Sequence, residues 1–102
     1  MIQIIDGRRY NTDTAELIAT TRRGRHGDVR FHTEYLFRTP LGAWFTYAHG
    51  CLASHYVELD GEVCTVEDDF RALTETEALA WLEAAGVVDL IERYFSERIT
   101  DA

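Results

Sequence analysis

Two histidines and two cysteines near the middle of the chain are the residues whose types could bind a metal: His49, Cys51, His55 and Cys64. Zinc sites of this composition usually take their ligands in close pairs. Here His-x-Cys-x₃-His is followed by a lone cysteine nine residues after His55, and Gly50 predicts a bend between the first two candidates. We therefore expect no metal and no cofactor, with a small zinc protein left as an alternative.

The same residues could supply a nucleophile, because Cys51 lies near His49 and His55 in the sequence. Such a site needs an acidified thiolate, a partner imidazole and an oxyanion site. The chain has no nucleophile elbow, P-loop, dinucleotide-binding glycine motif or H-E-x-x-H sequence. The pair Gly24-x-x-Gly27 has too few glycines to hold a phosphate. We expect a protein that is not an enzyme, and a small thiol enzyme is the alternative.

A run of acidic residues is the best candidate for a partner-binding surface. Its members are Asp60, Glu62, Glu67, Asp68 and Asp69. The dipeptide Asp60-Gly61 predicts a hairpin tip, and the later acids are expected in the loop that follows. Phosphates repeat every few ångströms along a DNA strand, so a row of carboxylates could mimic DNA and occupy a basic channel. The alternative is ordinary solubilising charge.

Three arginines form a smaller basic patch: Arg22, Arg23 and Arg25, with His26 and Arg30 nearby. The patch could contact a phosphate or an acidic partner. It could equally be a solvated loop, or associate with the acidic half of a second copy. We favour the second interpretation because the field of the whole molecule is negative.

The overall charge is strongly acidic and unevenly distributed. Ten arginines, no lysine and 18 acidic residues give a net charge of −8. Residues 1–51 carry seven arginines and five acids, whereas residues 52–102 carry three arginines and thirteen acids. This distribution repels nucleic acid and steers association with basic surfaces. We therefore expect a protein partner with a basic surface and no direct nucleic-acid binding.

The N-terminal third predicts a hairpin and a short helix. Residues 2–5 and 8–10 flank Asp6-Gly7, a dipeptide typical of a tight hairpin turn. Thr12 or Asp13 could then cap a helix, with Glu16 in the capping-box position. That helix would bury Ala15, Leu17 and Ile18 and would end at the basic loop 22–27.

The middle of the chain predicts an antiparallel meander. Alternating residues indicate strands at 29–39, 43–48, 54–59 and 62–66. The first two carry several aromatic side chains: Tyr35, Phe37, Trp44, Phe45 and Tyr47. These could form a base-stacking platform. We favour core packing, because the sheet must cover helices that also carry aromatic residues.

The C-terminal third predicts two helices. Thr74 and Glu77 form a capping box, which also accounts for the charges of Glu75 and Glu77. Leu79, Trp81, Leu82 and Ala85 follow at helical spacing before Gly86, a typical C-cap residue. A second amphipathic run covers residues 87–99.

These elements predict one domain over residues 1–102. The order β-β-α-β-β-β-β-α-α indicates an α+β fold, an antiparallel sheet with helices packed on one face. No apolar run approaches the roughly 20 residues of a membrane span, so we expect no membrane partner. An exposed edge strand leaves a homodimer open.

Three stretches of the chain form a further pattern: Arg9-Tyr10-Asn11-Thr12-Asp13-Thr14-Ala15-Glu16-Leu17-Ile18-Ala19, then Tyr35-Leu36-Phe37-Arg38-Thr39-Pro40-Leu41-Gly42-Ala43-Trp44-Phe45, and Leu73-Thr74-Glu75-Thr76-Glu77-Ala78-Leu79-Ala80-Trp81-Leu82-Glu83. These stretches resemble a family of short uncharacterised proteins of phages, plasmids and other mobile elements. The sequence Ser54-His55-Tyr56 fits a further part of the pattern. The family's usual glycine pair is here Gly50-Cys51. The resemblance covers most of residues 7–83.

The resemblance implies a shared fold and a mobile-element setting in a bacterial host. Some small acidic proteins of this kind inhibit CRISPR–Cas immunity. We therefore expect a cytoplasmic anti-defence protein, an anti-CRISPR inhibitor that binds a Cas effector and blocks DNA access or assembly. The alternative is a small regulatory interaction module, such as an antitoxin-like partner of a basic protein.

Overall fold

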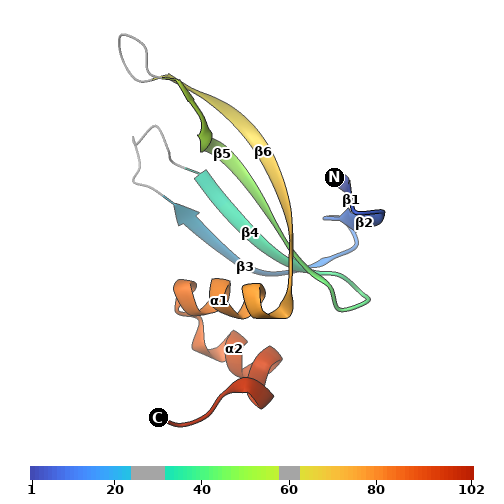
Figure 1. The fold of residues 1–102 in the computed structure, drawn as a ribbon, viewed down its shortest axis with the longest axis vertical. Helices are drawn as coiled ribbons and strands as arrows, with labels where there is room; N and C mark the ends of the chain where they lie inside the picture. Colours follow the sequence, from blue (N-terminus) through green and yellow to red (C-terminus); the bar gives the residue numbers. More distant parts are fainter. Residues whose placement is uncertain (24–31, 58–62) are drawn as a thin grey trace.

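The computed structural model describes residues 1–23, 32–57 and 63–102, without the side chains of residues 23, 51–57 and 63–67. Strands come first and helices last along the chain (Figure 1). The elements are β1 (Ile2–Ile5), β2 (Arg8–Asn11), β3 (Glu16–Arg23), β4 (His32–Arg38), β5 (Trp44–Val57), β6 (Val63–Leu73), α1 (Glu75–Ala85), α2 (Val88–Phe95) and the 3₁₀ turn η1 (Ser96–Arg98). The predicted α+β class is therefore confirmed.

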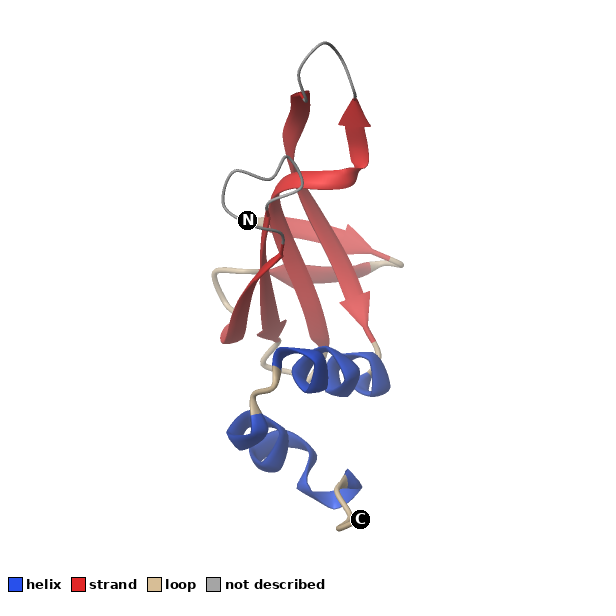
Figure 2. Cartoon of the chain, turned by 90° about the vertical axis from the view of Figure 1, so that its left-hand side faces the viewer, coloured by secondary structure: helices blue, strands red, loops and turns tan. Residues whose placement is uncertain are grey.

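The strands form two antiparallel sheets. β3, β4, β5 and β6 pair in that order in a four-stranded sheet, and β1 and β2 form a separate hairpin. Among the described residues, β4 pairs with β5 from Trp44 to Gly50, whereas β5 and β6 remain paired as far as Val57 and Val63. A two-stranded ribbon therefore extends from the sheet, away from the helices (Figures 1 and 2).

The N-terminal hairpin is confirmed. Ile2 pairs with Asn11 and Ile5 with Arg8 across the turn. Asp6 has φ 52° and Gly7 has φ 75°, and positive φ at both central positions is the requirement of a type I′ turn. Asp-Gly meets this requirement at low cost because both residues tolerate the left-handed region.

The short helix predicted after Thr12 or Asp13 is wrong, because residues 16–23 form strand β3. Asn11 closes a turn instead: its side-chain oxygen accepts a hydrogen bond from the Asp13 amide at 2.9 Å, and its carbonyl accepts one from the Ala15 amide at 3.1 Å. β3 then pairs along the free edge of β4, with an irregularity between Leu17 and Ala19. Pairing with the sheet thus outweighs the local capping signal.

Two predicted strands, 43–48 and 54–59, are largely one continuous strand, β5. The ladder with β6 is irregular between Cys51 and Tyr56, and Gly50 has φ 136°. A glycine in this region of φ lets the strand change direction without ending. Residues 58–59, the Asp60-Gly61 turn and Glu62 lie outside the described residues.

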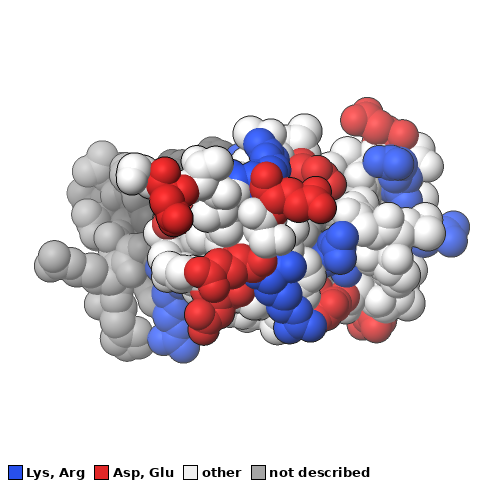
Figure 3. Space-filling view, turned by 90° about the horizontal axis from the view of Figure 1, so that it is seen from below, with Lys and Arg blue, Asp and Glu red and all other residues white. Residues whose placement is uncertain are grey.

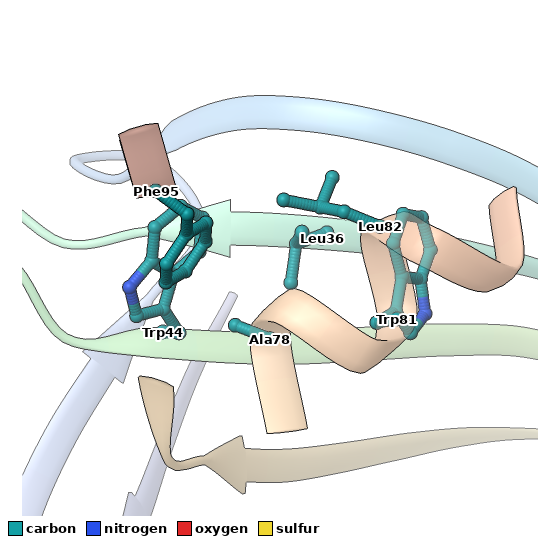
Figure 4. Packing of buried hydrophobic residues seen from close by; sticks show 6 residues of the cluster. All are labelled: Leu36, Trp44, Ala78, Trp81, Leu82 and Phe95. Carbon is teal, nitrogen blue, oxygen red and sulfur yellow. The ribbon is translucent and has the colours of Figure 1, made fainter. Parts of the chain in front are cut away.

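The helices cover one face of the four-stranded sheet, as predicted. Leu36 and Trp44 from the sheet pack against Ala78, Trp81 and Leu82 of α1 (Figure 4). Phe95 at the end of α2 stacks on Trp44 with a centroid distance of 5.4 Å. Trp81 also donates its indole hydrogen to Glu34 at 3.0 Å, so this buried ring has its polar group satisfied.

The hairpin β1–β2 packs against the other face. Tyr10, which is 5% exposed, meets Phe45 edge-on at 5.3 Å, and Phe45 stacks on Phe37 at 5.1 Å. Three of the five aromatic residues that were weighed as a stacking platform, Phe37, Trp44 and Phe45, are therefore core residues. The core interpretation holds for these three.

The two C-terminal helices are confirmed. Thr74 accepts the Glu77 amide at 3.1 Å, and Glu77 accepts the Thr74 amide at 2.9 Å, which completes the predicted capping box. Gly86 ends α1 with φ 71°. The second amphipathic run divides into α2 and η1. Within the described residues, no helix is long and apolar enough to cross a membrane.

Candidate functional site

The face of the sheet that carries the hairpin continues beyond it into a more exposed surface. Its side chains come from three neighbouring strands: Tyr35 on β4, Tyr47 and His49 on β5, and Asp68 and Phe70 on β6. Tyr35, Tyr47 and Phe70 are cross-strand neighbours, and His49 is paired with Asp68. Cross-strand partners and alternate residues of one strand share a face. We name these five residues the aromatic–acidic patch.

Asp68 is held by two side chains within the patch. Its Oδ1 atom accepts a hydrogen bond from the Tyr47 hydroxyl at 2.6 Å and lies 2.6 Å from Nδ1 of His49. The distance from the Tyr47 hydroxyl is typical of a short O–H···O bond to a charged acceptor. The Asp68 side chain is still 47% exposed, and its second oxygen makes no hydrogen bond to any other described residue. A carboxylate in a defined position therefore faces solvent.

These contacts shift the acid–base properties of the patch. Hydrogen bonds from Tyr47 and His49 lower the pKa of Asp68 below its ordinary value of 3.8. Burial, together with the hydrogen bond to Asp68, raises the pKa of Tyr47 to about 12. At neutral pH the patch thus contains an ionised carboxylate beside a neutral phenol.

The ionised carboxylate also determines which ring nitrogen of His49 carries a proton. A carboxylate can only accept, so Nδ1 must carry the proton that it donates to Asp68. In the neutral ring Nε2 is then an acceptor, and in the protonated ring it is a second donor. The His49 side chain is 55% exposed, so this nitrogen is accessible to a partner.

The aromatic members form a partly exposed continuation of the core. Tyr47 stacks on Tyr35 with a centroid distance of 5.7 Å and an interplanar angle of 18°, and it meets Phe70 at 5.1 Å. All three rings are half-buried. The rings of Phe37 and Phe45 and the hairpin lie on one side of them, and the polar pair His49 and Asp68 lies on the other. The face therefore grades from apolar to polar along the strands.

The predicted acidic row is divided by the structure. Glu67, Asp68 and Asp69 lie on strand β6 rather than in a loop, because the hairpin strands are longer than their alternation predicted. Successive residues of a strand point to opposite faces. Asp68 belongs to the patch, whereas Asp69 is paired with Ala48 on the helix-bearing face. Asp60 and Glu62 lie outside the described residues, as does the side chain of Glu67.

Of the arginines in the predicted basic patch, the structure describes only the side chain of Arg22. Arg22 is paired with Thr33, which is paired with His49, so one cross-strand row runs from Arg22 on β3 to Asp68 on β6. The side chain of Arg23, together with Arg25, His26 and Arg30, lies outside the described residues. The row thus carries opposite charges at its two edges.

Of the four predicted metal ligands, the structure describes only the side chain of His49. Its Nδ1 atom is occupied by Asp68, and the side chains of Cys51, His55 and Cys64 lie outside the described residues. Among the side chains that the structure does describe, no three histidine, cysteine or acidic groups gather closely enough to hold a metal ion. The cysteine nucleophile considered above also falls on these undescribed side chains.

Sequence reasoning missed Phe70 and the joining of Tyr47, His49 and Asp68. The signal was present in β6, where Asp68, Phe70 and Ala72 alternate with Asp69, Arg71 and Leu73. The run of three acids before Phe70 favours a loop, and this local signal hides the alternation.

Comparisons of the chain with protein-family models, with curated proteins and with solved structures found no match.

Proposed function

We propose that this protein acts without catalysis, by binding a basic surface of another protein through the aromatic–acidic patch. The observation that carries the proposal is the exposed carboxylate of Asp68, held between Tyr47 and His49 at 2.6 Å from each. A restrained carboxylate loses less conformational entropy on binding than a mobile one. It is therefore suited to pair with an arginine or lysine of a partner.

The rings beside Asp68 support the same kind of partner. A cation that reaches the carboxylate also lies close to Tyr47, which is stacked on Tyr35. Aromatic faces attract guanidinium and ammonium groups, by about 0.5–2 kcal/mol depending on solvent exposure. Tyrosine is also enriched where protein interfaces concentrate their binding free energy. The net charge of −8 adds long-range attraction toward a basic partner.

The specific partner that we propose is a Cas effector, which makes the protein an anti-CRISPR inhibitor in the cytoplasm of a bacterial host. The support is the resemblance of residues 7–83 to short proteins of mobile elements. RNA-guided effectors hold nucleic acid in strongly basic channels, and an acidic surface that enters such a channel would exclude DNA. Of the predicted acids, the structure describes the side chains of Asp68 and Asp69, and Asp68 lies in the aromatic–acidic patch, which supports this idea.

The test is a binding measurement against purified Cas effector complexes with and without bound DNA. The full chain is compared with Asp68→Asn and with Asp69→Asn, which removes the same charge one residue away on the opposite face. We expect Asp68→Asn to weaken binding by about tenfold or more, equivalent to roughly 1.4 kcal/mol. Asp69→Asn should stay within about twofold. High salt should weaken the wild-type complex.

The outcomes separate the parts of the proposal. Failure to bind any Cas effector would reject the anti-CRISPR role. Equal losses in the two variants would show that diffuse charge acts instead of the patch. Binding that does not change with salt would exclude the mimicry of DNA. If the protein instead co-purifies with a basic toxin from its host, the antitoxin-like alternative replaces the Cas effector as the partner.

A further inference from the structure

A pocket of about 380 Å³ lies at the helical end of the molecule, on the sheet face opposite the aromatic–acidic patch. Three arginines from separate elements line it: Arg38 from β4, Arg93 from α2 and Arg98 from η1. Figure 3 shows the molecule from this end, where arginines and acidic residues alternate over the surface. The pocket thus collects basic side chains within a protein of net charge −8.

Aromatic rings hold two of these arginines in place. The guanidinium carbon of Arg38 lies 5.3 Å from the ring centroid of Trp44 and 5.3 Å from that of Tyr94. The guanidinium carbon of Arg93 also lies 5.3 Å from the Tyr94 centroid. Two cations therefore share one ring, and contacts of this kind restrain the guanidinium groups without neutralising them.

None of the three arginines has an ion-pair partner among the described residues. Arg98 donates to the neutral hydroxyl of Thr76 at 3.2 Å, and Nε of Arg38 is buried without a hydrogen bond. The chain has 18 acidic residues, and two of them, Glu75 and Glu97, line the same pocket. Neither carboxylate lies within 4.0 Å of a nitrogen of these guanidinium groups, so no acidic group in the described part of the chain compensates the positive charges at short range.

Convergent cations repel one another, and an anion placed between them would relieve that repulsion. The planar guanidinium group offers paired N–H donors that match the oxygens of phosphate and carboxylate groups. Because Arg38 and Arg93 are already restrained by Tyr94, little ordering is needed when an anion binds. We propose that this pocket is a binding site for an oxyanion, a phosphate or a carboxylate group. It is separate from the proposed partner surface and does not depend on it.

The test is a titration of the full chain with inorganic phosphate, followed by backbone ¹H–¹⁵N chemical shifts at constant ionic strength. We expect saturable shifts at Ser96 and Glu97, which line the pocket, with a dissociation constant on the order of 1 mM. Parallel titrations with acetate and chloride distinguish the sources of the signal. Saturation by phosphate or by acetate identifies the oxyanion. Linear shifts that are equal for all three salts would overturn the proposal.

Variants confirm the location of the site. Arg93→Gln with Arg98→Gln should weaken phosphate binding at least tenfold. The matched control, Arg8→Gln with Arg9→Gln, removes the same charge from the hairpin and should change the affinity less than twofold. Glu97→Gln removes a nearby carboxylate and should tighten binding, an effect that misfolding cannot produce. Equal weakening in both arginine pairs, or no tightening in Glu97→Gln, would overturn the proposal.

Discussion

Replacing Tyr10 with alanine tests how the N-terminal hairpin is attached to the rest of the protein. The hairpin has no strand pairing to the four-stranded sheet, and its Ile2 and Ile4 side chains are 54% and 60% exposed. Tyr10 is 5% exposed and contacts Phe45. An isolated two-stranded hairpin is marginally stable at best in water. Its order therefore depends largely on Tyr10, with a smaller contribution from Ile5, which is partly buried against the same cluster.

The expected loss follows from that burial. Removing a buried aromatic side chain costs about 3–5 kcal/mol, and the edge-on contact with Phe45 belongs to the aromatic pairs worth about 0.5–1.5 kcal/mol beyond their area. The loss of stability has an upper limit, because a hairpin that has detached from the sheet has no further contacts with it to lose. We therefore expect the free energy of unfolding to fall by about 3 kcal/mol, within the 2–5 kcal/mol range of large-to-small core changes. For a domain of this size that corresponds to a fall in Tm of roughly 12–24 °C.

The assay is urea unfolding followed by circular dichroism, with Tyr10→Phe as the matched control. The Tyr10 hydroxyl has no hydrogen-bond partner among the described residues, so Tyr10→Phe should stay within about 0.5 kcal/mol of wild type. The Tyr10→Ala variant should also bind a hydrophobic dye, because Phe45 and Phe37 become exposed to solvent. A loss below about 1 kcal/mol for Tyr10→Ala would refute the inferred packing of the hairpin on the sheet.

Three further predictions test the patch and the helices. Asp68→Asn should lower the pKa of Tyr47 from about 12 toward 10.0 without reaching it, because burial is the larger cause of the shift; ¹³C NMR of the tyrosine ring measures this, and an unchanged pKa would contradict the hydrogen bond. Thr74→Ala should cost about 1 kcal/mol in thermal unfolding through loss of the cap. The Thr74 backbone amide is the larger cause of the lowered pKa of Glu77, below 4.5, and the Thr74 hydroxyl is the smaller one. Thr74→Ala removes only the hydroxyl, so the difference between variant and wild type should shrink only slightly as the pH falls through the folded pKa; a difference that grows at low pH would contradict this. Trp81→Phe should cost about 2 kcal/mol in urea unfolding, since it leaves a charged acceptor on β4 without its indole donor, and a neutral result would contradict that bond.

Local signals correctly predicted the Asp6-Gly7 turn and the two ends of α1. Asp6-Gly7 and the Thr74 capping box each depend on a few adjacent residues, and both have the expected geometry. Their chemistry is local: positive φ at one turn, and two amide donors that need acceptors at one helix end. Such features need no knowledge of the rest of the sheet.

The sequence did not predict strand β3, because that strand depends on pairing with a distant part of the chain. Its irregularity between Leu17 and Ala19 places Ile18 outside the regular register, so the apolar residues do not alternate as in a simple strand. Two adjacent apolar residues after a Thr-Asp cap then fit a helix equally well. Only the free edge of β4 decides between them, and its availability is a property of the folded sheet.

The sequence indicates several residues of the candidate site, but it does not predict how they are arranged. Asp68, His49 and Tyr47 were each singled out by type, as an acid, a metal candidate and a stacking candidate. Their contact depends on the register of β5 against β6, which places His49 opposite Asp68. Register is fixed by pairing over the whole hairpin, and the irregularity after Cys51 lies within it. Residue type alone could not supply that alignment.

The role of an acidic residue in this protein depends on which sheet face or helix end it occupies. Glu77 completes a cap, and Asp69 points to the helix-bearing face. Asp68 is fixed by two hydrogen bonds at the edge of an aromatic surface. A net charge of −8 would attract many basic partners with little selectivity, whereas a single oriented carboxylate beside stacked rings can distinguish one basic surface from another. The comparison of Asp68→Asn with Asp69→Asn therefore decides whether the acidity of the chain acts as a general field or through one placed group.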